Sequence, residues 1–425
     1  MGAPLKRAGA RKSLDEHLKE LERLADTAGA EVVGIRTQQL DRPHPGTYLG
    51  KGKIDELKTM VGERNVSLII FDDELSPSQG KNIEDMVGTR VVDRAELILD
   101  IFATRARSSE ARMQVELAQL EYTLPRLTRM WTHLEKFRGG IGVRGPGETQ
   151  LETDRRLINH RIKLLKERLA HVQQNRMVQR QSRASSFKAS IVGYTNAGKS
   201  SILRGMTGAM DVHVEDRLFA TLDPLTREVD LGENAHVLLT DTVGFIRKLP
   251  HHLVASFRAT LEETRDADLL LHVVDASHPL WEEQRMVVEQ VLGDLGITDQ
   301  PTLLVFNKMD LLNEADALAL QERVTALVPN AVFVSTQAEH GLDPLFRALR
   351  HAMRARRPVA EVWLHPRDGK LLAEIHQHGE VLDQRSEGEQ IVIRARLPER
   401  LRGRLEQAGA DVRATNGAPL KVAGV

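Results

Sequence analysis

Residues 193–200 read Gly-Tyr-Thr-Asn-Ala-Gly-Lys-Ser, in which two glycines, a lysine and a hydroxyl residue have the spacing of a phosphate-binding loop. The apolar run 188–192 precedes this loop and the stretch 201–206 has helical character, so the loop connects a strand to a helix. Backbone N–H groups at a helix N-terminus attract phosphate oxygens. Lys199 would then reach the β- and γ-phosphates of a nucleotide, and the Ser200 hydroxyl would ligate Mg²⁺. The alternative is a glycine-rich turn that binds nothing.

A second segment, Asp241-Thr-Val-Gly244, follows the strand-like run 236–240. An acidic side chain at such a strand end can hold Mg²⁺ through water, and the Gly244 N–H can meet a γ-phosphate. Between this segment and the phosphate loop lies Thr221, where a threonine could ligate Mg²⁺ in the triphosphate state only. Thr226 is the competing choice, and a plain turn residue is the alternative for both.

A third segment, Asn307-Lys-Met-Asp310, follows the apolar run 302–306. The Asp310 carboxylate can accept hydrogen bonds from guanine N1–H and from its exocyclic amino group, whereas adenine has no donor at N1. Lys308 would lie along the phosphate loop, and Asn307 would brace the base site. Ser335 and Thr336, after the strand-like run 331–334, would meet the base through their backbone. We therefore expect GTP and GDP to bind here.

These segments define the candidate site. The expected nucleotide contacts are Gly193, Tyr194, Thr195, Asn196, Ala197, Gly198, Lys199, Ser200, Ser201, Asp241, Thr242, Val243, Gly244, Asn307, Lys308, Asp310, Ser335 and Thr336. The expected metal ligands are Ser200, Thr221 and Asp241, and the catalytic roles are assigned to Lys199, Thr221 and Gly244.

Phe245 occupies the place where many GTPases carry a glutamine that orients the attacking water. A phenyl ring cannot hydrogen-bond to that water. We therefore expect Mg²⁺, Lys199 and backbone amides to stabilise the phosphoryl charge, with slow turnover until a partner orders the loops. Asn196 is a candidate to hold a monovalent cation such as K⁺ beside the phosphates; a loop-stabilising amide is the alternative.

The whole chain has 425 residues, no cysteine and a formal net charge of −1. This length suits about three domains, and the cysteine count excludes disulfides and thiolate metal sites. No apolar run approaches the roughly 18 residues of a membrane span, and the basic N-terminus lacks a signal-peptide core. We expect a cytoplasmic monomer.

Residues 107–183 have the pattern of a helical hairpin. Apolar residues at steps of four and three form two seams: Met113, Leu117, Leu120, Leu124, Leu127, Trp131 and Leu134, and then Ile158, Ile162, Leu165, Leu169 and Val172. Pro125 should interrupt the first helix, and the tip Arg138–Glu148 should not be helical. Residues 126–183 contain 14 Lys plus Arg against 5 Asp plus Glu, a local charge of +9. This charge suits a large anionic partner and a solvated basic helix face equally well. In the tip, Arg138 and Arg144 could form bidentate contacts, which favours a phosphate-contacting tip over a flexible connector.

The flanking regions read as two further domains. Residues 1–106 predict a small α/β unit, with strands at 32–35 and 67–71 and helices at 54–61 and 78–87, the latter capped by Ser78. Residues 184–357 would form the GTPase domain. Residues 358–425 predict an α+β domain with strands at 361–364, 380–385 and 390–397 and helices at 370–376 and 398–408.

The chain resembles the HflX family of ribosome-associated GTPases. The resemblance is carried by Tyr48–Lys53, Val92–Phe102, Gln114–Gln119, Gly139–Glu148 continuing into Leu151–Arg156, and Asp241–Phe245. It implies an N-terminal domain, a hairpin, a P-loop GTPase domain and a C-terminal domain. It also implies binding to the large ribosomal subunit and ribosomal RNA through the tip Arg138–Glu148, and splitting or rescue of stalled ribosomes under stress such as heat. No DNA partner is expected. The alternatives are a GTP-stabilised RNA-binding scaffold in subunit assembly and an ATP-dependent RNA remodeller, which Asp310 argues against.

Overall fold

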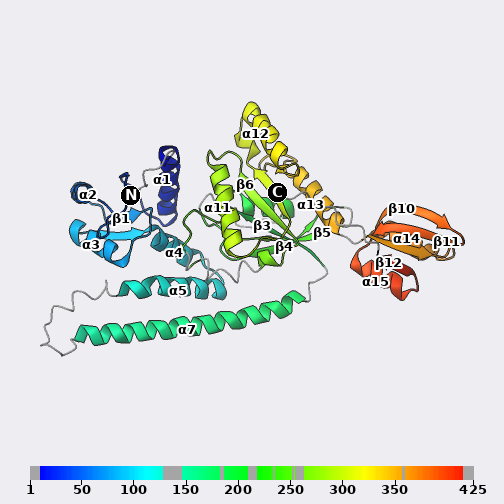
Figure 1. The fold of residues 1–425 in the computed structure, drawn as a ribbon, viewed down its shortest axis with the longest axis horizontal. Helices are drawn as coiled ribbons and strands as arrows, with labels where there is room; N and C mark the ends of the chain where they lie inside the picture. The colour runs from blue at the N-terminus through cyan, green and yellow to red at the C-terminus, as the bar shows by residue number, and fades with distance from the viewer. Residues whose placement is uncertain are drawn as a thin grey trace.

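The largest sheet has six strands and forms the centre of the molecule (Figure 1). The computed structural model describes residues 10–127, 146–181, 186–208, 218–232, 235–250, 253, 263–356 and 359–414. The sheet order is β4-β5-β3-β6-β7-β8. Its strands are β3 (Phe187–Gly193), β4 (Leu225–Asp230), β5 (His236–Asp241), β6 (Leu269–Asp275), β7 (Thr302–Asn307) and β8 (Val332–Phe333). β4 runs antiparallel to β5 and the other five strands are parallel, so these five end at one edge of the sheet.

Helices cover both faces of this sheet, because successive residues of a buried strand point to opposite sides. On one face, Ile191 of β3 packs in a cluster with α8 (Lys199–Thr207) and α13 (Asp343–Arg356). On the other face, Val192 packs with α11 (Trp281–Asp294). Helix α12 (Glu314–Leu327) packs with β6 and β7. The predicted α/β architecture is confirmed.

The N-terminal region has a two-stranded parallel sheet of β1 (Leu68–Phe71) and β2 (Arg90–Asp93). Its helices are α1 (Ala10–Thr27), α2 (Lys51–Arg64), α3 (Pro77–Val87) and α4 (Arg94–Arg105). The predicted strand at 32–35 is wrong, because the backbone of these residues does not pair with a strand of the sheet. Their apolar side chains line a cavity beside α1 and α2. The predicted cap of α3 is also wrong. Ser76 caps the helix by accepting from the Gln79 N–H, and Pro77 takes the first helical position.

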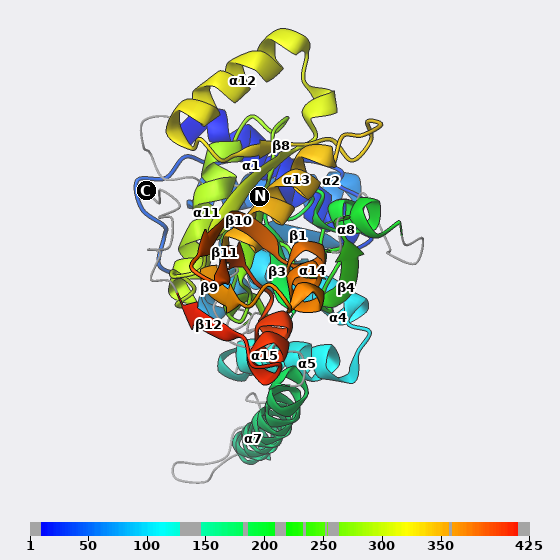
Figure 2. The ribbon, with the colours of Figure 1, turned by 90° about the vertical axis from the view of Figure 1, so that its right-hand side faces the viewer.

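The predicted hairpin consists of α5 (Ser109–Thr123), a 3₁₀ turn η1 (Leu124–Arg126) around Pro125, and α7 (Pro146–Gln181). α5 begins beside the six-stranded sheet, and five residues separate the end of α7 from β3, so the two helices run in opposite directions (Figures 1 and 2). The predicted seams pack together from Met113 to Leu124 and from Ile158 to Leu169.

The tip of the hairpin differs in part from the prediction. Residues Pro146–Glu148 were predicted to belong to the non-helical tip, but α7 starts at Pro146, a residue that suits the first turn of a helix. Trp131 and Leu134 of the first seam and residues 138–145 of the tip lie outside the described residues.

The C-terminal region is a separate four-stranded antiparallel sheet with the order β10-β11-β9-β12. Its chain order is β9 (Val359–Leu364), α14 (Gly369–His378), β10 (Glu380–Glu387), β11 (Gln390–Arg396), α15 (Glu399–Gln407) and β12 (Asp411–Ala414). This is the βαββαβ arrangement of ferredoxin-like folds. The three predicted strands and both helices are present, and β12 was missed. Among the described helices, none is both long and apolar enough to cross a membrane.

Candidate functional site

The phosphate loop follows β3 and leads into α8, as the sequence predicts. Gly198 precedes the helix with a φ of 93°, and a Cβ at this position would lie 2.1 Å from Asn307 Nδ2. Asn307 Nδ2 donates to the Ala197 carbonyl oxygen at 2.9 Å, and the side chain is fully buried. Asn307, which was assigned to the base site, thus braces the phosphate loop. Gly193 also needs its small size, because a Cβ there would lie 2.3 Å from the Val273 carbonyl oxygen.

The segment 242–248, which we call the glycine segment, lies directly against this loop. Thr195 N–H donates to the Phe245 carbonyl oxygen at 2.7 Å, and Phe245 N–H donates to the Gly193 carbonyl oxygen at 3.1 Å. A Cβ on Gly244 would lie 2.8 Å from Thr195 Cα and 3.0 Å from Lys199 Nζ. The glycine is therefore required for the close approach that brings the Gly244 backbone next to Lys199.

The Lys199 ammonium group is buried beneath the loop. Its Nζ donates to the carbonyl oxygens of Tyr194 at 2.9 Å and Gly193 at 3.2 Å. Burial lowers the pKa of Lys199 to about 8, although the nearby Asp241 carboxylate acts in the opposite direction. A cation held by neutral carbonyl groups in a desolvated place gains strongly from a phosphate anion, which suits the role assigned to this lysine.

Ser200, Thr221 and Asp241, the three predicted metal ligands, come together from three separate segments. Ser200 Oγ lies 2.6 Å from Asp241 Oδ2 and 2.7 Å from Thr221 Oγ1, and Thr221 Oγ1 donates to Asp241 Oδ2 at 2.9 Å. Burial raises the pKa of Asp241, while Lys199 and the two hydroxyls oppose that rise. Asp241 Oδ1 is buried without a hydrogen-bond partner in the described residues. Two hydroxyls and a carboxylate are hard oxygen donors, so the set fits Mg²⁺.

The predicted base site forms at the ends of β7 and β8. Ser335 Oγ donates to Asp310 Oδ1 at 2.5 Å and accepts from the backbone N–H groups of Gln337 and Ala338. This contact fixes the carboxylate that would read guanine, and half-buried Thr336 follows in the same loop. Lys308 Nζ lies 2.7 Å from Asp275 Oδ2, a residue that the sequence interpretation missed. Asp275 is the last residue of the apolar strand β6 and pairs with Asn307. An acidic residue at the end of an apolar strand is the sequence signal from which Asp275 could have been predicted.

Other predicted contacts use their side chains elsewhere. Thr242 donates its hydroxyl proton to the Ile191 carbonyl oxygen at 2.6 Å, and the side chains of Val243 and Phe245 are buried in the core. Only the backbone groups of these three residues are therefore available to the site. The Phe245 ring is buried in this apolar cluster and has no group that could hydrogen-bond to an attacking water. Asn196 takes the left-handed conformation with a φ of 60°. Ser201 lines the same small cavity as Ser200 and Thr221.

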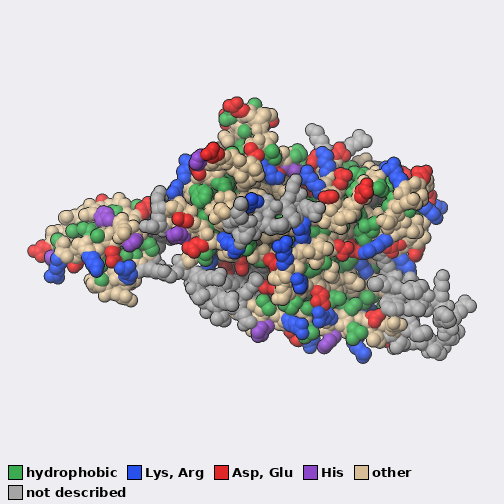
Figure 3. Space-filling view, turned by 180° about the vertical axis from the view of Figure 1, so that it is seen from behind, with side chains coloured by type: hydrophobic (Ala, Val, Ile, Leu, Met, Phe, Trp, Pro, Cys, Tyr) green, Lys and Arg blue, Asp and Glu red, His purple; other side chains and the backbone are tan. Residues whose placement is uncertain are grey.

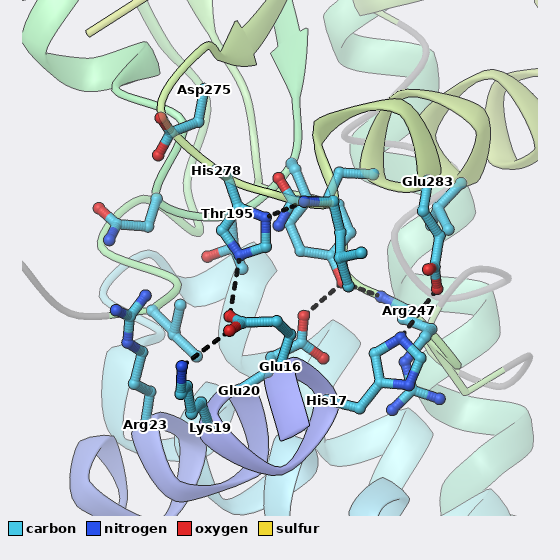
Figure 4. Close-up of a pocket in the computed structure, with 16 residues that line it drawn as sticks. Glu16, His17, Lys19, Glu20, Arg23, Thr195, Arg247, Asp275, His278 and Glu283 are labelled. Carbon is cyan, nitrogen blue, oxygen red and sulfur yellow. Dashed lines mark hydrogen bonds and ion pairs between the residues drawn. The ribbon is translucent and has the colours of Figure 1, made fainter. Parts of the chain in front are cut away.

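A network of charged and polar groups joins this site to the N-terminal region. The Tyr194 hydroxyl donates to Glu20 of α1 at 2.5 Å and accepts from the Arg247 N–H at 2.8 Å. Figure 4 shows this side of the phosphate loop, where a pocket lined by α1 residues such as Glu16 and His17 faces Thr195 and Asp275. Tyr194, predicted as a nucleotide contact, therefore directs its side chain towards α1.

Asp72, at the end of β1, is the centre of that network. Its carboxylate lies 2.8 Å from Arg94, 2.8 Å from Arg247 and 3.2 Å from Lys248. Burial alone would raise the pKa of Asp72, but these three cations hold it at about 2. Arg94 also pairs with Glu20 and donates to the Arg247 carbonyl oxygen at 3.1 Å. The glycine segment is thus tied to β1, α1 and α4.

The segment 218–223, which we call the threonine segment, has its own ties to the N-terminal region. The ring of Phe219 packs edge-on against Phe102 of α4, with centroids 4.6 Å apart. Asp223 accepts hydrogen bonds from Arg107 N–H at 3.2 Å, from Ser108 N–H at 3.1 Å and from the Ser108 hydroxyl. Neither Phe219 nor Asp223 was singled out in the sequence, because nothing local shows which distant element they meet.

Comparisons with known proteins identify the family of this chain. Family profiles described as "GTP-binding GTPase N-terminal", "GTP-binding GTPase Middle Region" and "50S ribosome-binding GTPase" match residues 15–103, 105–183 and 188–308. The GTPase HflX of Caldanaerobacter subterraneus is 50% identical over 80% of this chain and 77% of its own length. The GTPase HflX of Escherichia coli is 46% identical over 85% of each.

A solved structure of a GTP-binding protein from Sulfolobus solfataricus in complex with GDP is 25% identical, with a TM-score of 0.43, over 83% of this chain and 98% of that one. The family itself rests on the profiles and on the full-length relatives. With the phosphate loop, the Asp310–Ser335 pair and the buried Lys199 in place, the chain is a GTPase and belongs to the HflX family.

Proposed function

We propose that this GTPase is a nucleotide-driven switch that binds the large ribosomal subunit in its GTP form, leaves after hydrolysis, and splits or rescues stalled ribosomes under stress such as heat. It would act as a monomer in the cytoplasm. In this proposal the chain has four domains, at residues 1–106, 107–183, 184–357 and 358–425. The helical hairpin at 107–183 contacts ribosomal RNA.

The observation that carries the proposal is the exposed basic character of α7. Between residues 150 and 172 all six Lys and Arg side chains are exposed, against three acidic residues. Figure 3 shows Lys, Arg and His side chains along the outer side of this helix, at the bottom of the view. Charge of this kind favours a phosphate backbone. The description of the matched profile, a 50S ribosome-binding GTPase, supports the same partner.

The roles at the site follow from its chemistry. Bound Mg²⁺ would neutralise charge on the β- and γ-phosphates, and Ser200, Thr221 and Asp241 would hold it directly or through water. Lys199 would place its proton-bearing Nζ against the same oxygens, and the Gly244 N–H would face the γ-phosphate. Because the Phe245 ring is buried, water orientation falls to backbone groups or to a partner. Asn196 would help to hold K⁺ beside the phosphates.

The test is co-sedimentation with purified large subunits in the presence of GTP, GDP or a non-hydrolysable GTP analogue. We expect retention with GTP analogue and release with GDP, since equal affinity in the two states would make no switch. Arg155→Glu with Arg156→Glu should weaken binding, whereas the matched reversal of exposed Lys51 and Lys58 on α2 should not. Equal sedimentation in all nucleotide states contradicts the proposal.

The rival is a GTP-stabilised scaffold in subunit assembly. A variant that binds GTP but does not hydrolyse it separates the two, because a scaffold should tolerate the loss and a switch should stay trapped on the subunit.

A further inference from the structure

The threonine segment is fixed at both of its ends, and the residue between the two fixed points is Thr221. At the first end, Phe219 N–H donates to Thr195 Oγ1 at 3.0 Å, and the Phe219 ring is buried against Phe102 of α4. Phe219 has a φ of 57°, a left-handed conformation that a bulky residue rarely adopts. Such a conformation persists only where surrounding contacts impose it, which here are the aromatic pair and the phosphate loop.

At the second end, Asp223 is bound to the N-terminus of α5. Its Oδ2 accepts two backbone N–H groups, from Arg107 and Ser108, and its Oδ1 accepts the Ser108 hydroxyl proton. Ser108 is also the N-cap of α5, since its Oγ accepts from the Ala111 N–H at 3.0 Å. A carboxylate at this place meets both unsatisfied N–H groups and the positive end of the helix dipole.

Thr221 lies two residues from each of these fixed points, and its hydroxyl is one of the three metal-type oxygens. Its position relative to Ser200 and Asp241 therefore depends on where α4 and α5 sit. α5 in turn packs along α7, with Arg161 pairing to Glu116 at 2.6 Å. The base of the hairpin is thus connected to the metal-type oxygens by the hydrogen bonds of Asp223 and by the two residues of chain from Asp223 to Thr221.

We propose that Asp223 is a positioning residue for the GTPase reaction: by binding the N-terminus of α5 it holds Thr221 at the Mg²⁺ site, so that the hairpin sets the competence of the GTP state. This inference rests on the proposed role of Thr221 as a ligand of Mg²⁺ in the GTP state only. It assigns to the N-terminus of α5 an indirect part in GTP hydrolysis, which acts through Asp223 and Thr221.

The experiment measures the Mg²⁺ concentration needed for half-maximal nucleotide binding by the full chain, with a non-hydrolysable GTP analogue and with GDP. Asp223→Ala should raise this concentration about tenfold with the analogue, the size expected for losing a charge-assisted anchor, and leave it unchanged with GDP. Ser108→Ala should act in the same direction but less, because both backbone contacts remain.

Conservative variants separate positioning from damage. Asp223→Asn can keep all three partners if the Ser108 hydroxyl reverses its role, so it should recover most of the wild-type behaviour. Ser109→Ala, at the exposed neighbouring position, is the matched control and should change nothing. Combining Asp223→Ala with Ser108→Ala should add little to the first change, since both remove the same contact.

Three results would overturn the proposal. One is wild-type Mg²⁺ dependence in folded Asp223→Ala, or in Ser108→Ala if the former does not fold. Another is an equal change with GDP, which would indicate general damage to the loop. The last is a Thr221→Ala variant whose Mg²⁺ requirement with the analogue equals that of wild type, which would also remove the assignment of Thr221 as a Mg²⁺ ligand. If Thr221→Ala changes this requirement and Asp223→Ala does not, only the positioning role of Asp223 is removed.

Discussion

The base end and the phosphate end of the nucleotide site are supported by different parts of the chain. At the base end, the described contacts come from loops of the six-stranded sheet itself: Asp310 with Ser335, and Lys308 with Asp275. At the phosphate end, the loop, the threonine segment and the glycine segment each also bind the N-terminal region or the hairpin, through Tyr194–Glu20, Asp223–Ser108 and Arg247–Asp72.

This difference separates the recognition of the base from the recognition of the γ-phosphate. Which base is bound can be read by a few side chains without disturbing anything distant. Under the proposed function, the γ-phosphate would be read by segments that are hydrogen-bonded or packed against α1, β1, α4 and α5. A change at those segments can therefore move the first 125 residues, and a partner on those residues can change hydrolysis.

The largest effect is expected from a substitution that changes recognition of the base and leaves the phosphate end intact. Asp310→Asn replaces an acceptor for two guanine donors with an amide that suits the 2-oxo group of xanthine. The preference for GTP over xanthosine triphosphate should fall by about a thousandfold or more. Because the base end is local, hydrolysis at saturating xanthosine triphosphate should match that of wild type with GTP. Competition binding and single-turnover rates measure this, with exposed Asp299→Asn as the control. A slower saturated rate would show that the two ends are not separate.

A smaller effect is expected where the glycine segment meets β1. Asp72→Asn leaves Arg94, Arg247 and Lys248 around a neutral group and should lower the free energy of unfolding by about 3 kcal/mol. The folded pKa of Asp72 lies below its ordinary value, at about 2, so its stabilisation is present above roughly pH 4 and is lost as pH falls towards 2.

Denaturant titrations at pH 6 and pH 3 measure both parts of this prediction. The difference between wild type and Asp72→Asn should be largest at pH 6 and shrink at pH 3, while exposed Asp85→Asn should show neither effect. A difference that is the same at both pH values would mean that the charge of Asp72 is not what holds the segment.

The smallest effect concerns protons at Lys199. With a pKa of about 8 in the free protein, this lysine is mostly neutral at pH 8.5, and bound phosphates favour its charged form. GTP binding at pH 8.5 should therefore take up about 0.7 proton, falling towards zero near pH 7. Calorimetry in buffers of different ionisation enthalpy measures the uptake. Lys199→Arg stays protonated and should show none; equal uptake in both proteins would assign the proton elsewhere.

Much of the site could be predicted because its segments are local. The phosphate loop, Asp241–Gly244 and Asn307–Asp310 each follow an apolar strand, and the parallel sheet brings the ends of those strands to one edge. The two helix seams were visible for the same reason, since an apolar period needs no knowledge of distant residues.

What could not be predicted depends on contacts between distant segments. Asp223 and Ser108 are 115 residues apart, and Asp72 and Arg247 are 175 apart, so no local pattern pairs them. The strand expected at 32–35 had the right composition but no ladder partner in the fold, because β-propensity depends on the neighbour that receives it. β12 was missed because Asp411–Ala414 is only four residues long and half polar.

The length of α7 has a mechanical consequence. With 36 residues at the usual rise, it is about 54 Å long. A tilt of about 10° at the end near β3 would carry the opposite end through roughly 9 Å, as for any rigid rod of this helical length. A helix of this length would therefore turn a small tilt at the end near β3 into a displacement as large as a nucleotide at its far end.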